Sequence, residues 1–239
     1  MRNVLRIDAS PRQSRSLSRA LGDTFIEALA RQGKARIVRR DLASTELRFI
    51  DEEWIAAAFT PEAERTAGQH SALALSDTLI DELASAEVLV IATPMYNYGM
   101  PAALKAWVDQ VVRIGKTFTF DLVRGDFPLE PVLKGMTLDL LTSRGEFGFE
   151  PGGIRQGQDH LVPQFATIAK YLGAGRLEHV GIEYQEFGGQ RHEVSVRSAH
   201  EHARALAARL ARGQSEGLVP TRHLHPSKNG AANTASRPL

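Results

Sequence analysis

Short apolar stretches alternate with helical patterns along the chain, and this alternation restricts the fold more than any other feature of the sequence. The apolar stretches predict five strands, which are Val4–Ile7, Arg36–Leu42, Val88–Ala92, Met136–Thr142 and Leu177–Tyr184. Strands that alternate with helices imply a parallel sheet covered by helices on both faces. We therefore predict an α/β domain over residues 1–212, with a doubly wound five-stranded sheet in the order 2-1-3-4-5.

The helices follow from apolar residues spaced by about one turn. Leu17, Leu21, Phe25 and Leu29 recur every four residues, which predicts a helix with one apolar face. Ser16 is well placed as the N-cap of this helix. Further helices are expected over 66–84, 102–112, 161–172 and 192–212, and a short one within Phe49–Ile55.

Two connecting segments and the end of the chain have a different character. Gly115–Phe120 alternates between apolar and polar residues and predicts a small hairpin arm, followed by a loop over residues 121–134. From Gly213 onward glycine, serine, asparagine and proline dominate and no apolar period remains. This composition predicts a disordered tail over residues 213–239.

Composition limits the kinds of site and partner. The chain has no cysteine, which removes disulfides, thiolate metal sites and cysteine nucleophiles, and fits an intracellular, cytoplasmic location. The net charge of +1 gives no argument for binding nucleic acid or an anionic membrane. No stretch approaches the roughly 20 apolar residues of a membrane span. His223 and His225 lie in the predicted tail, so no metal site is expected.

A serine-rich turn follows the first predicted strand and precedes the first helix. It contains Ser10, Ser16 and Ser18, with Leu17 as the first helical residue. Helix N-termini present unpaired N–H groups and favour anions, so these residues could form a phosphate cradle. The alternative is that Ser16 caps the helix and the other serines are ordinary loop residues.

An aromatic loop follows the third predicted strand. Met95, Tyr96, Asn97 and Tyr98 stand between that buried strand and the next helix, where open α/β sheets bind ligands. A flat conjugated ligand lying against the loop would explain its two aromatics. The alternative is that Met95, Tyr96 and Tyr98 plug the top of the core.

A third loop, Ser143–Glu146, follows the fourth predicted strand. It includes Ser143, Arg144, Gly145 and Glu146, and Gly145 would let a backbone approach a ligand closely or would simply form a turn. In the 2-1-3-4-5 order the first and third loops flank one crevice and this loop lies next to it. A phosphate cradle beside an aromatic slot suits a ligand with one phosphate and a planar ring, which favours FMN. Neither G-x-G-x-x-G nor G-x-x-x-x-G-K-[ST] occurs at the first turn, which argues against a tightly held dinucleotide or a nucleoside triphosphate.

These segments resemble one known family. Ser10, then Ser16-Leu17-Ser18, then Pro94-Met95-Tyr96-Asn97-Tyr98, then Ser143-Arg144-Gly145 look like segments of the FMN-dependent NADH-azoreductases. Those enzymes are also NAD(P)H:quinone oxidoreductases of the flavodoxin-like fold. The resemblance covers about residues 3–210, and the Met-Tyr-Asn-Tyr motif with the serine spacing is fairly specific to the family.

The resemblance implies a function and a set of contacts. It implies a homodimer with FMN near the interface, NADH or NADPH as donor, and quinones or aromatic azo compounds as acceptors in a ping-pong cycle. Carried over by position, the FMN contacts are Ser10, Ser16, Leu17, Ser18, Met95, Tyr96, Asn97, Tyr98, Ser143, Arg144, Gly145 and Glu146. The chain departs from the family at Glu146, where a second glycine is common. Because FMN carries the chemistry, no catalytic side chain is expected.

Two other readings stay open. An NAD(P)H-dependent reductase that releases reduced FMN or reduces metal ions would use the same pocket. An electron carrier of the flavodoxin type would bind FMN without turning over NADH, although such carriers tend to be strongly acidic and this chain is not.

Overall fold

Five parallel strands form the central sheet of the computed structural model, which describes residues 2–33 and 35–213. They are β1 (Arg2–Asp8), β2 (Ala35–Asp41), β3 (Val88–Pro94), β6 (Met136–Ser143) and β7 (Ala174–Ile182). Their order is β2-β1-β3-β6-β7, which confirms the predicted 2-1-3-4-5 arrangement. All neighbouring pairs in this sheet are parallel, so the carboxyl ends of the strands meet at one edge.

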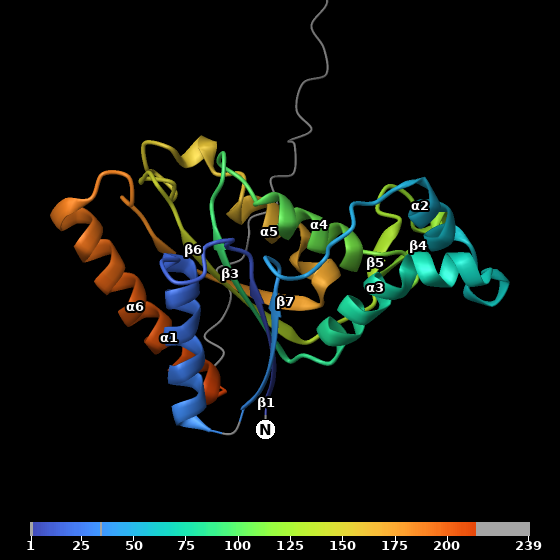
Figure 1. Ribbon diagram of the computed structural model, residues 1–239, viewed down its shortest axis with the longest axis horizontal. Helices are drawn as coiled ribbons and strands as arrows, with labels where there is room; N and C mark the ends of the chain where they lie inside the picture. The colour runs from blue at the N-terminus through green and yellow to red at the C-terminus, as the bar shows by residue number, and fades with distance from the viewer. Residues whose placement is uncertain (1, 34, 214–239) are drawn as a thin grey trace, which may run out of the picture.

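Helices cover both faces of this sheet (Figure 1). α1 (Leu17–Gln32) and α6 (Gly189–Ala211) pack together on one face. The other face carries α3 (Ala67–Ala84), α4 (Ala102–Val111) and α5 (Val162–Ile168). Side chains alternate along a strand, so the neighbours Val90 and Ile91 of β3 enter the two opposite apolar cores. β3 is buried along its whole length, as expected for a central strand.

Side-chain caps determine where two of the helices begin. Ser16 Oγ accepts a hydrogen bond from the Arg19 N–H at 3.3 Å, which confirms Ser16 as the N-cap of α1. At α3, Thr66 Oγ1 accepts from the Gln69 N–H at 3.3 Å and Gln69 Oε1 accepts from the Thr66 N–H at 3.0 Å. Both caps satisfy N–H groups that have no partner within the helix.

The short helix expected within Phe49–Ile55 lies farther along the chain. α2 spans Glu52–Phe59, because Asp51 Oδ1 accepts the Trp54 N–H at 2.8 Å and so caps the helix. Trp54 Nε1 donates to Gln110 Oε1 of α4 at 3.0 Å. This buried hydrogen bond ties the segment between β2 and α3 to the main body of the domain.

The predicted arm is present, but its second strand was missed. β4 (Phe118–Phe120) pairs antiparallel with β5 (Leu129–Pro131), so the prediction of a continuous loop over residues 121–134 is wrong in part. Pro131 is compatible with β5 because it sits at the last position of a strand with one neighbour. In Figure 1 this arm lies beside α2, and the Lys116–Glu62 ion pair at 3.2 Å joins the start of the arm to the 3₁₀ turn Glu62–Glu64 that follows α2.

The last elements are displaced from their predicted bounds. β7 ends at Ile182, before the predicted end at Tyr184, whose φ of 64° is not an extended conformation. The helix predicted over 161–172 is α5 followed by a 3₁₀ turn, Ala169–Leu172, and Gly173 ends it with φ 85°. α6 begins at Gly189 rather than at residue 192.

Residues 214–239, nearly all of the predicted tail, lie outside the described residues, and the boundary at residue 212 stays a prediction. Among the helices of residues 2–33 and 35–213, none combines the length and the apolar character needed to cross a bilayer.

Candidate functional site

Backbone hydrogen bonds hold three strand ends together at the carboxyl edge of the sheet. The N–H of Ala9, just after β1, donates to the Ala92 carbonyl in β3 at 2.9 Å. The N–H of Met95, just after β3, donates to the Ser143 carbonyl at the end of β6 at 2.8 Å. The serine turn, the aromatic loop and the Ser143–Glu146 loop therefore meet at one place, as the strand order predicts.

A pocket of about 140 Å³ opens where these loops meet. The predicted site residues that line it are Ser10, Ser16, Leu17, Met95, Tyr96, Ser143 and Gly145. The other lining residues are Arg12, Arg15, Pro94, Gln185 and Glu186. The predicted residues that do not line it are Ser18, Asn97, Tyr98, Arg144 and Glu146.

The serine turn presents two hydroxyls to the pocket. Ser10 Oγ accepts a hydrogen bond from the Arg12 N–H at 3.2 Å and keeps its own proton to donate. Ser18 is fully buried, and its hydroxyl lies 3.2 Å from that of Ser16. This hydrogen bond helps to orient the Ser16 hydroxyl. Leu17, the first residue of α1, lines the same pocket, and the N–H groups at the start of a helix have no acceptor within the helix. The turn is therefore a set of neutral donors at a helix N-terminus, which suits an anion.

A buried arginine holds this turn in shape. Arg19 donates to the Ser10 carbonyl from Nε at 3.1 Å and from Nη2 at 2.6 Å. The same guanidinium pairs with the Asp41 carboxylate at 2.9 and 2.6 Å. The hydrogen bond from Arg19 lowers the pKa of Asp41 below its ordinary value. The Arg19 guanidinium thus binds the turn and β2, and Arg19 does not line the pocket.

A second buried guanidinium lies under the start of α1. Arg6 Nη2 donates to Asp8 Oδ1 at 2.8 Å and to the Arg19 carbonyl at 3.0 Å. A Cβ at Gly22 would lie 2.9 Å from the same Nη2, so only glycine leaves room for it. Arg6 therefore fixes the distance between α1 and β1, and with it the position of the serine turn at the start of α1.

The aromatic loop is a tight turn. The Tyr96 N–H donates to the Gly99 carbonyl at 3.1 Å, and the Gly99 N–H donates to the Tyr96 carbonyl at 2.9 Å. Asn97 and Tyr98 both adopt positive φ, 47° and 64°, as the two central residues of a type I′ turn do. Met95 and Tyr96 therefore line the pocket, whereas Asn97 and Tyr98 form the tip of the turn.

The two tyrosines do not plug the core. Tyr96 is 41% and Tyr98 42% exposed, whereas Met95 is half-buried and packs against the core. The alternative reading of this loop therefore holds for Met95 alone. Tyr96 presents an exposed aromatic side chain at the pocket, where a planar ring could lie against it.

Arg144 points away from the pocket. Its guanidinium is buried and pairs with Asp159 at 2.8 Å and Glu183 at 3.4 Å, and it lies 4.9 Å from the Phe149 ring centroid. The backbone N–H of Arg144 donates to the Ile182 carbonyl at 2.8 Å. The side chain lines a different hollow of about 460 Å³, so only its backbone stands close to the predicted site.

Glu146, where the family often has glycine, also has partners outside the pocket. Its carboxylate pairs with Arg155 at 3.0 Å. It also accepts a hydrogen bond from the Tyr98 hydroxyl, and this contact raises the pKa of Tyr98 above its ordinary value. Glu146 therefore joins the tip of the aromatic loop to the β6 loop.

The loop after β7 supplies two lining residues that the sequence reading missed. The Glu186 N–H donates to the Gly145 carbonyl at 3.0 Å, and the Gln185 N–H donates to the Arg144 carbonyl at 3.3 Å. β7 lies next to β6, so its carboxyl-end loop belongs to the same edge of the sheet. That rule would have found Gln185 and Glu186 if the end of the strand had been predicted at Ile182.

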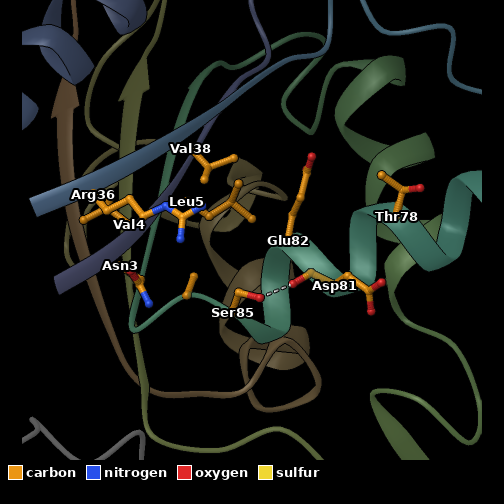
Figure 2. Close-up of a pocket in the computed structure, with 10 residues that line it drawn as sticks. Asn3, Val4, Leu5, Arg36, Val38, Thr78, Asp81, Glu82 and Ser85 are labelled. Carbon is orange, nitrogen blue, oxygen red and sulfur yellow. Dashed lines mark hydrogen bonds between the residues drawn. The ribbon is translucent and has the colours of Figure 1, made fainter.

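A larger hollow of about 380 Å³ lies at the opposite, amino end of the sheet between β2 and α3 (Figure 2). Two of its polar side chains already have partners: Glu82 pairs with Arg40, which lies outside the hollow, and Ser85 Oγ donates to the Asp81 backbone carbonyl at 2.7 Å. Ligands of parallel sheets bind at the carboxyl ends of strands. The smaller pocket is therefore the candidate site.

The described residues contain no group of three or more histidine, aspartate or glutamate side chains able to hold a metal ion. Hydroxyls, helix N–H groups, backbone carbonyls and an exposed tyrosine line the pocket, together with the charged residues Arg12, Arg15 and Glu186. This donor set suits a phosphate at one end and a planar, hydrogen-bonding ring at the other.

Comparison with known proteins supports the fold and identifies the family. A family model described as flavodoxin-like fold matches residues 2–210. The chain is 48% identical over 227 residues to the FMN-dependent NADH:quinone oxidoreductase 2 of Idiomarina loihiensis, with 92% of this chain and 95% of that protein covered. It is 41% identical over 209 residues to the FMN-dependent NAD(P)H:quinone oxidoreductase 1 of Pseudomonas aeruginosa, covering 87% and 99%.

Solved structures give the same fold. The azoreductase of Bacillus anthracis str. Sterne superposes with a TM-score of 0.77 at 24% sequence identity. The superposition covers 87% of this chain and 99% of that one. At this identity the likeness supports the fold, and the two quinone oxidoreductases carry the family assignment.

Proposed function

Because the chain belongs to the flavodoxin-like family of FMN-dependent NADH:quinone oxidoreductases, we propose that it passes two electrons from NADH or NADPH to quinones. We also propose that it reduces aromatic azo compounds, cleaving the azo bond to amines, by a ping-pong mechanism. One observation carries the proposal: an anion cradle and an exposed aromatic lie on one pocket, at the carboxyl edge of a doubly wound sheet.

The groups that line the pocket support FMN as its ligand. The FMN phosphate would be held by the hydroxyls of Ser10 and Ser16 and by the N–H of Leu17. The flavin ring would lie along Met95 and Tyr96, with the backbone of Ser143 and Gly145 at its other edge. FMN, when bound, supplies the hydride chemistry.

The protein's contribution is position. The Tyr96–Gly99 turn and the Met95–Ser143 hydrogen bond hold the two walls of the pocket at a fixed separation. Arg19 and Arg6 fix the cradle relative to β1. None of the lining side chains is needed as a nucleophile. A donor that leaves before the acceptor enters the same slot gives ping-pong kinetics.

We further propose a homodimer in which the partner completes the pocket. The support is a set of exposed apolar side chains on α2 and on the arm between β4 and β5, namely Ile55, Phe59, Phe120, Leu122, Val123 and Phe127. Contiguous exposed apolar side chains mark interaction surfaces. Sedimentation of wild type and of Val123→Asp/Phe127→Asp tests this: the dimer is expected to dissociate in the double variant.

The kinetic part of the proposal is tested by initial rates with donor and quinone both varied. Parallel double-reciprocal lines and the detection of aromatic amines from an azo substrate would support it. Intersecting lines contradict the ping-pong mechanism. Reduction of free FMN or ferric ion without quinone reduction would favour the reductase alternative.

A further inference from the structure

Two arginines, Arg12 and Arg15, lie on the rim of the pocket. Arg12 and Arg15 are exposed, and within residues 2–33 and 35–213 neither guanidinium makes a hydrogen bond, an ion pair or a ring contact. Both nevertheless line the candidate site. Free positive charge beside an anion cradle attracts a further anion.

Other arginines at this edge of the sheet are neutralised. Arg19 pairs with Asp41, Arg144 with Asp159, and Arg155 with Glu146. Arg12 and Arg15 therefore contribute two positive charges within one short turn, whereas Glu186 is the one acidic residue among the described residues that line the pocket. An exposed guanidinium with no partner keeps all five N–H donors for a ligand.

The pair also separates two hollows. Arg12 and Arg15 line the candidate pocket on one side, and on the other they line an open hollow of about 450 Å³ together with Gln13 and Ser14. A ligand that entered from solvent over the pocket would pass these two side chains. The pair is thus placed for a ligand that comes and goes.

The cofactor does not require these charges. In the proposed function the single FMN phosphate rests on Ser10, Ser16 and the N-terminus of α1, and helix N-termini bind phosphate without a cation. The nicotinamide donor brings a pyrophosphate, and NADPH brings one phosphate more. The guanidinium fork matches phosphate oxygens two at a time.

We infer that Arg12 and Arg15 bind the phosphates of the reduced nicotinamide dinucleotide and so help to determine the donor KM. This inference rests on the proposed function, because it requires that the donor reduces bound FMN. It assigns the donor to the side of the pocket formed by the β1–α1 turn.

The expected effect is on donor binding rather than on the chemical step. Each lost charge-assisted contact is expected to raise the donor KM about tenfold. A contact made equally in the ground state and the transition state changes KM and leaves kcat within about twofold. Rising salt should weaken donor binding in wild type more than in the Arg12→Gln/Arg15→Gln double variant.

The test uses FMN-loaded Arg12→Gln, Arg15→Gln and the double variant. Arg36→Gln is the matched control, since Arg36 is another exposed arginine, at the amino end of β2, and makes no ion pair with any residue that the structure describes (Figure 2). KM and kcat are measured for NADH and for NADPH, and FMN dissociation is followed by flavin fluorescence. The quinone half-reaction is measured separately after reduction by dithionite.

A KM increase for both donors, with FMN retained, assigns the pair to the pyrophosphate. An increase for NADPH alone assigns it to the extra phosphate, and either result supports the inference. Loss of FMN with unchanged donor KM, an equal KM increase in Arg36→Gln, or no change in any variant overturns it. If wild type itself fails to oxidise NADH and NADPH, the proposed function fails instead.

Discussion

The side chain of Glu186 rests directly on Gly145. A Cβ at position 145 would lie 2.7 Å from both Cδ and Oε1 of Glu186, and 3.0 Å from its Cγ. The Glu186 N–H also donates to the Gly145 carbonyl at 3.0 Å. The loops after β6 and β7 are therefore in contact at the candidate site, and glycine at position 145 is what permits that contact.

Replacing Gly145 by alanine should force the exposed Glu186 side chain out of its present position on the pocket wall. Because both line the pocket, we expect FMN affinity to fall about tenfold, the effect of losing one good contact. FMN titration followed by fluorescence measures it. Gly157→Ala is the control, since a Cβ there meets no atom within 4 Å.

The cause of that loss can be separated from a general loss of folding. Glu186→Ala removes the Cγ, Cδ and Oε1 atoms that a Cβ at residue 145 would strike. The double variant Gly145→Ala/Glu186→Ala should therefore bind FMN more tightly than Gly145→Ala alone. Equal affinities in the two variants would contradict the steric explanation.

Ser16 has two roles, as a helix cap and as part of the cradle. Ser16→Ala should lower the free energy of unfolding by about 1 kcal/mol, the usual cost of an N-cap. It should also weaken FMN binding about tenfold by removing a hydroxyl from the phosphate. Urea unfolding of the apoprotein and FMN titration measure the two effects.

Thr66→Ala is the matched control for Ser16. Thr66 caps α3 with the same hydrogen-bond pattern and does not line the pocket. It should cost a similar amount of stability and leave FMN affinity unchanged. A Thr66→Ala protein that loses FMN as readily as Ser16→Ala would show that the cradle assignment is wrong.

Asp139 should make stability depend on pH. Its carboxyl is fully buried in β6, and neither oxygen has a hydrogen-bond partner among the described residues. Burial, followed by the charge of Glu178, raises its pKa from 3.8 to about 7. At pH values between these two pKa values, Asp139 is protonated in the folded protein and ionised in the unfolded chain. The free energy of unfolding therefore falls as pH rises through this range, by about 4 kcal/mol at most.

Asp139→Asn removes this titration. Urea unfolding at pH 5 and pH 8 should show the variant gaining stability relative to wild type at the higher pH. The control is Asp126→Asn, which should show no such gain, because Asp126 is exposed and forms no ion pair within the described part of the chain. A difference between Asp139→Asn and wild type that is the same at both pH values contradicts the buried-acid account.

The strand order and the meeting of the site loops could be predicted because they depend on local patterns. Val88–Ala92 is apolar throughout, so its place at the centre of a parallel sheet follows from composition alone. Ser16 sits immediately before an apolar helical period, so its cap follows from spacing. The convergence of loops then follows from topology.

Side-chain directions could not be predicted because partners distant in the sequence decide them. Arg144 belongs to a predicted site loop, yet Asp159 and Glu183 draw its guanidinium away from the pocket. β5 lies in a stretch with Pro128 and Pro131 that reads as a loop, and only pairing with β4 makes it a strand. Glu186 was missed because β7 ends earlier than its apolar pattern suggests.

The visible absorption spectrum of the purified protein is the most direct test of the central claim. It is recorded before NADH, after NADH without oxygen, and again after a quinone is added. We expect flavin bands that bleach with NADH and return with quinone. A colourless protein that also fails to take up added FMN would contradict the assignment of the pocket and the function proposed from it.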